Sequence, residues 1–101
     1  MGKPVYGMTL ASMKEAWYQL SEEEQADFMA KIRKLQEQDG ARPVIMCNSV
    51  WATHQWEWFG VMEFPDVEAL QRHAAHCAEL NWLRYIDATT TIGTKWPAEE
   101  P

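Results

Sequence analysis

The sequence has few basic residues for its length. Its 101 residues include nine Lys and Arg against fifteen Asp and Glu, which gives a net charge of −6. Proteins that bind nucleic acid carry clustered cations, whereas the basic residues here stand singly among acids, apart from Lys31, Arg33 and Lys34. The same acidity disfavours an anionic membrane surface. The composition therefore predicts that neither nucleic acid nor a membrane is a partner.

The sequence also lacks the features of an exported or membrane-spanning chain. The start, Met1 to Leu10, has no charged-then-apolar signal layout, and no apolar run approaches membrane-spanning length. The two cysteines, Cys47 and Cys77, form no close-spaced motif, which favours free thiols in a reducing compartment over a disulfide. We therefore expect a cytoplasmic protein. Nucleophile elbow, phosphate-loop, dinucleotide and zinc patterns are also missing from the sequence.

Tryptophan, by contrast, is abundant. Six tryptophans occur in a chain of which 47% is hydrophobic. A chain of this length fits one domain with one modest core, so we expect residues 1–101 to form a single domain. So many large rings exceed what a small core encloses. Some of them are expected to line a cavity or a subunit interface.

Hydrophobic patterning predicts four strands and two main helices. Alternating or β-branched segments favour strands at 5–10, 44–51, 56–64 and 86–95. Ser21 and Glu24 have capping-box spacing for a helix that ends at Asp39-Gly40, and Asp66 is the expected N-cap of the second main helix. Ser12 and Glu15 have the same spacing before a short helical stripe.

The predicted order is strand, helices, strand, strand, helix, strand. This order is typical of an α+β, ferredoxin-like split β-α-β fold, with both main helices on one face of a four-stranded antiparallel sheet. The other face would be a large apolar patch, which monomers rarely expose. We therefore expect a homodimer or higher homo-oligomer in which two copies pack sheet against sheet and enclose a space.

One part of the sequence resembles a known superfamily. The run Met62–His73 is similar to the third strand and second helix of the dimeric α+β barrel superfamily, and Phe64 and His73 keep the aromatic-to-histidine spacing of its antibiotic-biosynthesis-type monooxygenases. The segment from Glu68 through Leu80 to Asp87 also resembles muconolactone isomerase. The resemblance implies a ferredoxin-like fold and a dimeric α+β barrel. It implies no single reaction, because the superfamily includes cofactor-free oxygenases, isomerases, cyclases and haem-degrading enzymes.

Three residues of the second main helix have a spacing that can chelate a metal. His73, His76 and Cys77 stand at i, i+3 and i+4. A helical projection at about 100° per residue places His73 at the flank of the apolar face and His76 toward solvent, so His76 and Cys77 point apart. Structural metal sites normally need four ligands. We therefore predict no metal and no cofactor, with haem binding through His73 or His76 as an alternative.

His73 is the first candidate catalytic residue. A histidine at the boundary of core and solvent can act as a general acid or base near neutral pH. The alternative is a half-buried histidine that only bonds a neighbouring loop. His54, in the turn between the second and third strands, and His76 are further possible site residues, although exposed histidines are often idle.

The third strand is expected to supply the walls of the cavity. Trp56, Trp58, Gly60 and Met62 share one side, and Phe59 and Val61 share the other. We predict that Phe59 and Val61 pack beneath the helices and that the tryptophans face the inter-sheet space. Gly60 would then leave room for a ligand near the strand. Alternatively, the rings only seal the dimer.

The last strand is expected to supply polar groups to the same space. Asp87, Thr89 and Thr91 share one side, which is too polar for a helix-packed core. An enclosed Asp87 could exchange protons with a substrate; the alternative is a solvated residue at the strand edge. Tyr6 and Asn48 could add hydrogen bonds.

These residues lead to a functional hypothesis. We expect a small-molecule enzyme of the isomerase or cyclase type that acts by proton transfer on an aromatic or conjugated carbonyl compound. His73 or Asp87 would move the proton, and Tyr6, Asn48, Trp56, Trp58, Thr89 and Thr91 would bind the substrate. The alternatives are a cofactor-free monooxygenase acting on a phenol or quinol, a non-catalytic ligand-binding or dimerisation module, and a haem-binding protein.

Overall fold

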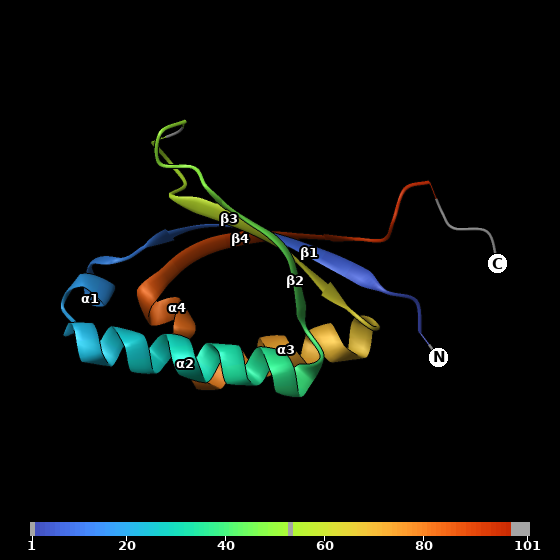
Figure 1. Cartoon of the computed structure of the whole chain (residues 1–101), viewed down its shortest axis with the longest axis horizontal. Coiled ribbons are helices and arrows are strands. Elements are labelled where there is room, and N and C mark those ends of the chain that lie inside the picture. The colour runs from blue at the N-terminus through green and yellow to red at the C-terminus, as the bar shows by residue number, and fades with distance from the viewer. Residues whose placement is uncertain (1, 53, 98–101) are drawn as a thin grey trace.

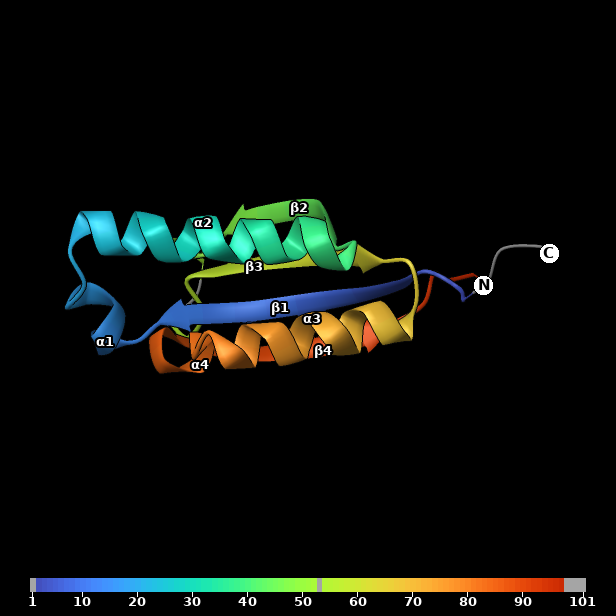
Figure 2. The same ribbon diagram turned by 90° about the horizontal axis from the view of Figure 1, so that it is seen from below.

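The chain folds into a sheet covered on one side by helices. The computed structural model describes residues 2–52 and 54–97. In chain order the elements are β1 (Val5–Met13), α1 (Glu15–Tyr18), α2 (Glu22–Asp39), β2 (Arg42–Asn48), β3 (Trp58–Phe64), α3 (Val67–Glu79), α4 (Trp82–Tyr85) and β4 (Ile86–Gly93). The antiparallel strands lie in the order β2-β3-β1-β4. Helices α2 and α3 lie side by side on the same face (Figures 1 and 2). The predicted split β-α-β, ferredoxin-like α+β fold is confirmed.

Local sequence signals fix the ends of both main helices. The Ser21 hydroxyl accepts from the Glu24 N–H at the start of α2, and the Glu24 carboxylate accepts from the Ser21 N–H, as the capping box predicted. Gly40 ends α2 at φ 79°, a left-handed conformation that favours glycine. At the start of α3, Asp66 accepts from the Ala69 N–H at 2.8 Å. None of the described helices has the length and apolar character needed to cross a bilayer.

The capping box predicted at Ser12 is wrong. Strand β1 continues to Met13, and the Ser12 hydroxyl donates to the Gln55 carbonyl at 2.7 Å and accepts from the Glu57 N–H at 3.1 Å. Helix α1 begins after Lys14 without a side-chain cap. Pairing of β1 with β4 continues through Met13, and these ladder hydrogen bonds outweigh one local cap.

The side-chain core lies between the sheet and the helices. Ala11, Phe28, Ile32, Cys77 and Ile86 form one buried cluster, and Trp58 packs against it. Trp58 therefore faces the helices, and the prediction that it faces the inter-sheet space is wrong. The reason is volume: Gly7 and Ala11 of β1 lie on the helix side and leave space that larger β3 side chains fill.

Phe59 and Val61 lie on the opposite face, contrary to prediction. This face, away from α2 and α3, is called the open face. Its apolar side chains form two rows across the sheet, because directly paired residues share a face. The strand pairing gives these rows as Ile45–Val61–Met8 and Cys47–Phe59–Leu10, which end on β4 at Thr91 and Thr89.

Candidate functional site

The most deeply buried polar side chain of the described residues belongs to Asp39, the last residue of α2. Its exposed fraction is 1%. Two histidines of α3 reach it: His73 Nδ1 lies 2.9 Å from Oδ2, and His76 Nδ1 lies 2.9 Å from Oδ2 and 3.0 Å from Oδ1. Arg72 Nε is 3.7 Å from Oδ1. A carboxylate at the end of one helix thus joins two imidazoles of the neighbouring helix.

The partners of Asp39 determine its protonation. Burial alone would raise the pKa of this carboxyl, but hydrogen bonds from His76 and His73, together with the attraction of their charges, outweigh burial and hold the pKa below its ordinary value. Asp39 is therefore an ionised acceptor at neutral pH. It follows that the Nδ1 atoms of both histidines carry the protons that they donate to it.

Both nitrogens of His73 are occupied within the protein. Cys77 Sγ lies 3.5 Å from His73 Nε2. Burial, and then the charge of Asp39, raise the pKa of the Cys77 thiol to about 11, so it remains a thiol that donates to this nitrogen. The His73 ring also contacts Phe64, with centroids 5.7 Å apart. His73 therefore has a supporting position, and Cys77 is not an activated nucleophile.

His76 is the more accessible histidine of the pair. Its side chain is 26% exposed, against 13% for His73. His76 Nε2 has no hydrogen-bond partner among residues 2–52 and 54–97. The projection that placed His76 toward solvent is thus wrong in part, because the carboxylate at the end of α2 holds one edge of the ring against the protein.

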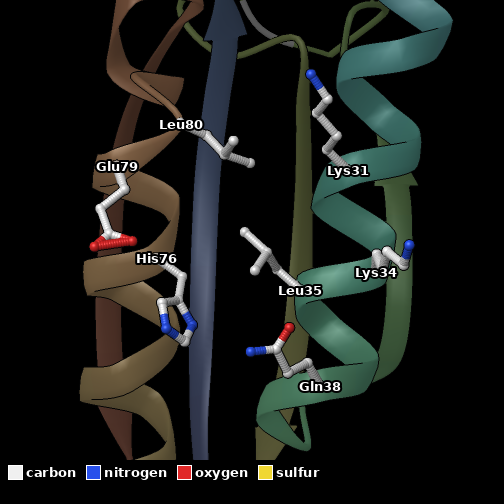
Figure 3. Close-up of a pocket in the computed structure, with 7 residues that line it drawn as sticks. All are labelled: Lys31, Lys34, Leu35, Gln38, His76, Glu79 and Leu80. Atoms are coloured by element: carbon white, nitrogen blue, oxygen red, sulfur yellow. The ribbon is translucent and has the colours of Figure 1, made fainter.

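A groove between α2 and α3 borders His76 (Figure 3). Its volume is about 220 Å³. The α2 wall is formed by Lys31, Lys34, Leu35 and Gln38, and the α3 side by His76, Glu79 and Leu80. The side chains of Lys34, Gln38 and Glu79 make no hydrogen bond or ion pair with any described residue. The groove thus combines a free imidazole nitrogen, two lysines, one carboxylate and an apolar floor.

The predicted residues of β4 and β1 lie on the open face, on the other side of the sheet from His73. Asp87, Thr89 and Thr91 are exposed, and Tyr6 is half-buried. They therefore share one surface, as predicted, but none of the described helices covers that surface. Asp87 and His73 are separated by the sheet and do not form one site.

Other predicted residues are placed differently from the prediction. Asn48 Oδ1 accepts from the Val50 N–H at 3.0 Å, and Asn48 pairs with Trp58 on the helix side. Trp56 is half-buried in the segment before β3, and His54 is exposed in the same connection. The space beside Gly60 holds the Met46 side chain, so the prediction of free room for a ligand there is wrong.

The described residues include no group of three or more His, Cys, Asp or Glu side chains arranged to hold a metal ion. The three hydrogen-bonded residues Asp39, His73 and His76 use their facing atoms on one another. Their arrangement instead suits proton transfer, because a carboxylate that accepts from Nδ1 fixes the ring and stabilises its charged form.

Comparison with known proteins finds similarity only in structure. No family model and no curated protein sequence matches the chain. A mutant chlorite dismutase from Candidatus Nitrospira defluvii aligns with a TM-score of 0.71 and 16% identity over 93% of this chain and 41% of that one. A DABB family protein with a ferredoxin-like fold from Mesorhizobium loti aligns with a TM-score of 0.63 and 16% identity over 91% and 96%. The likeness is one of fold. The chain has the ferredoxin-like α+β fold that the resemblance implied.

The length of these neighbours differs. A heme-binding protein from Thermus thermophilus aligns with a TM-score of 0.68 and 15% identity over 92% of this chain but 40% of that one. The chain spans less than half the length of the chlorite dismutase chains that it matches. The Mesorhizobium loti protein is matched over nearly its whole length.

Sequence reasoning missed Asp39. Its position before Gly40 identified it only as the end of a helix. One signal was available: most surface helices favour a cation in their last turn, because the C-terminal end of the helix dipole is negative. The last turn of α2 has no basic residue and ends in an aspartate. Such an unfavourable carboxylate indicates a compensating partner elsewhere in the fold.

Proposed function

We propose that the protein is a small-molecule enzyme of the isomerase or cyclase type, in which His76 transfers a proton on an aromatic or conjugated carbonyl compound. The observation that carries the proposal is the His76 ring. A buried carboxylate holds its Nδ1 at 2.9 Å, and its Nε2 is free beside a groove. A neutral imidazole held in this way can act as a base and then as an acid.

The proposed step is a proton shift through an enolate. His76 Nε2 takes a proton from the carbon next to the carbonyl, and the C–H electron pair forms a carbon–carbon double bond while the carbonyl oxygen becomes an enolate. The ring is then an imidazolium that Asp39 stabilises. For an isomerase, it returns the proton to another carbon of the conjugated enolate, which gives the isomer. For a cyclase, the enolate carbon forms a bond to a second carbonyl carbon of the substrate, the C=O electron pair moves to that oxygen, and the resulting alkoxide takes the proton from the imidazolium. The Gln38 amide lies on the opposite wall and can donate to the enolate oxygen.

In this proposal His73 is a positioning residue. Its Nδ1 donates to Asp39 Oδ2, the oxygen that His76 also contacts, and its Nε2 accepts from Cys77. The same His76 base could deprotonate a phenol or quinol for a cofactor-free oxygenase. The panel described next includes both substrate classes, so it separates these reactions. Absence of any turnover would favour the non-catalytic binding module.

The test is proton exchange on a panel of aromatic ketones, unsaturated lactones and phenols. NMR in D₂O measures the exchange of protons next to the carbonyl and any conversion of the compound. We expect His76→Gln to reduce the rate about 100-fold or more, since a general base contributes roughly 10²–10⁴-fold. His54→Gln is the matched control, because His54 is an exposed histidine outside the groove. Equal rates in the two variants would contradict the proposal.

Haem binding is a second candidate, suggested by the name of the Thermus thermophilus neighbour. A histidine that donates its other N–H to a carboxylate is typical of haem and metal ligands, and His76 has this arrangement. The groove does not fit the group, however. Its volume of about 220 Å³ is below the usual range for sites that enclose drug-sized ligands, and haem is larger than most of these. Proton transfer is therefore the better-supported function.

A hemin titration separates the two candidates. The proton-transfer proposal predicts no Soret band that depends on His76. A band that forms with the unmodified protein and is lost in His76→Ala, but kept in His54→Ala, would establish haem binding and replace the first proposal.

We further propose that the active form is a homodimer, located in the cytoplasm, whose subunits pack through their open faces. The rows Ile45–Val61–Met8 and Cys47–Phe59–Leu10 present an apolar surface that a single chain leaves uncovered. The β2–β3 connection, which includes Val50 and Trp51, extends to the side of the sheet away from α2 and α3 (Figure 1). A second copy would cover both features and enclose Asp87, Thr89 and Thr91 as a further ligand contact surface.

A further inference from the structure

The α2 wall of the groove is positively charged in an otherwise acidic protein. Among the lining residues Lys31 and Lys34 oppose the single carboxylate of Glu79, which leaves a local charge of +1 with His76 neutral. The whole chain has a charge of −6. Figure 3 shows both lysines on α2, with Lys31 on the side that faces α3 and the exposed Lys34 ammonium turned away from α3. The lysine wall of the groove is therefore more attractive to a small anion than the rest of this acidic protein surface, although the carboxylates of Asp27 and Asp39 lie beside Lys31 and His76.

The lysines are available to a ligand. Lys34 makes no hydrogen bond or ion pair with any described residue. Lys31 contacts Asp27 at 3.1 Å, but both side chains are more than half exposed, and such i,i+4 pairs are weak. A ligand carboxylate can thus replace Asp27 beside Lys31 at little cost. Leu35 and Leu80 lie between the charged walls and can contact an apolar ligand body (Figure 3).

Building on the proton-transfer function, we propose that the substrate carries a carboxylate in addition to its carbonyl group. Lys31 holds the carboxylate, the exposed Lys34 adds positive charge to the same wall, the ring or chain of the substrate lies over Leu35 and Leu80, and the carbonyl end faces His76. The size of the groove favours a small acid. A carboxylate suits this wall because an ammonium acts as a point charge and needs no paired donors, whereas no arginine fork lines the groove.

The test compares two probes of equal size, 4-acetylbenzoate and its neutral amide, 4-acetylbenzamide. NMR of the His76 ring measures binding of each to the unmodified protein. We expect 4-acetylbenzoate to shift the ring signals and to bind about fivefold more tightly than the amide, with the difference shrinking as salt rises. Equal dissociation constants for the two probes at low salt would overturn the inference.

Removal of one positive or one negative charge from the groove gives an independent measurement of the dissociation constant. Lys34→Gln should raise the dissociation constant of 4-acetylbenzoate about two- to fivefold, and Glu79→Gln should lower it by a similar factor. Arg33→Gln is the matched control, since Arg33 is a neighbouring α2 cation that does not line the groove. An effect of Lys34→Gln no larger than that of Arg33→Gln would overturn the inference.

The same probes distinguish failure of this inference from failure of the proposed function. Deuterium exchange of the acetyl methyl group reports proton transfer for both compounds. If both probes bind equally while His76→Gln abolishes exchange, the carboxylate inference is wrong and the proton-transfer function stands. If 4-acetylbenzoate binds with the expected charge dependence but exchange is the same in His76→Gln, the groove is an anion site and the proposed reaction is wrong.

Discussion

The two sides of the sheet differ in whether one chain satisfies their side chains. The helix-covered side has partners for its buried charge within the chain, whereas the open face leaves apolar side chains uncovered. On the helix side, Asp39 is almost fully buried and has two imidazole donors with an arginine nearby, so its charge is compensated within the chain. On the open face, two rows of apolar side chains run across three strands and end at Thr91 and Thr89. The first region depends on internal hydrogen bonds, and the second would be covered by a second copy in the proposed homodimer. This contrast predicts different responses to substitution.

Removal of the buried carboxylate should have the largest effect. Asp39→Ala leaves two imidazole N–H groups without their acceptor and removes the hydrogen bonds of Asp39 between α2 and α3. We expect the free energy of unfolding to fall by about 3 kcal/mol, the order found when one partner of a buried ionic network is removed. Urea unfolding followed by circular dichroism measures it.

Asp27→Ala is the control for this change. Asp27 lies on the same helix, in an exposed pair with Lys31, and its removal should cost less than about 0.5 kcal/mol. If both variants lose the same stability, the Asp39 network does not hold the helices together as described.

A charge on the open face should affect assembly more than folding. Val61→Glu places a carboxylate in the middle of an apolar row, where a second copy would bury it without a partner. We expect the dissociation constant of the dimer to rise at least about 100-fold, because burial of an unpaired charge costs several kcal/mol. Light scattering at micromolar concentration measures the mass.

The control substitution is Leu83→Glu, because Leu83 is a large exposed side chain on α4, away from the apolar rows. It should leave the mass unchanged. An unmodified protein that is monomeric at micromolar concentration would show that the open face is not a subunit interface.

A fall in pH should lower the free energy of unfolding, because protonation of Asp39 removes its charge from the helix-covered side. The folded-state pKa of this carboxyl lies below the unfolded value, so the stability that it contributes is present above the unfolded pKa and is lost as pH falls through the folded pKa. The difference in unfolding free energy between the unmodified protein and Asp39→Asn should therefore shrink between pH 6 and pH 2. A difference that stays constant over this range would contradict the assignment of a lowered pKa.

The two thiols should report the two regions separately, and this is the smallest effect. Cys77 has a pKa of about 11, so only about one thiol in a thousand is ionised at pH 8, and iodoacetamide should label it only after unfolding. Cys47 lies on the open face, so iodoacetamide should label it faster in the Val61→Glu variant than in the unmodified protein. Mass spectrometry of the labelled peptides, with Cys47→Ser as control, measures both. Rapid native labelling of Cys77 would contradict its buried thiol state.

The sequence predicted the fold well because its signals are local. The capping box at Ser21, the left-handed Gly40 and the cap at Asp66 each depend on a few neighbouring residues. Where local and long-range signals competed, the sheet prevailed, as at Ser12, which pairs with Asp87 instead of capping a helix.

The site was harder to predict because it depends on distant pairs. His76 and Asp39 are far apart in sequence, and only the packing of α3 against the end of α2 brings them together. The wrong face for Trp58 has a similar origin. Alternation showed that Trp58 and Phe59 face opposite ways, but the small residues of β1 decide which side has room for a large ring.

The edge of the sheet at β2 affects how the protein would aggregate. Val44, Ile45 and Met46 are each more than half exposed on this outer strand. A foreign strand that approached it would find no N–H at Pro43, and the irregular register between Pro43 and Ile45 would disturb continuous pairing. Fibril growth through this edge is thus discouraged. The regular β4 edge has no proline in Ile86–Gly93, so cross-β stacking on heating would begin there.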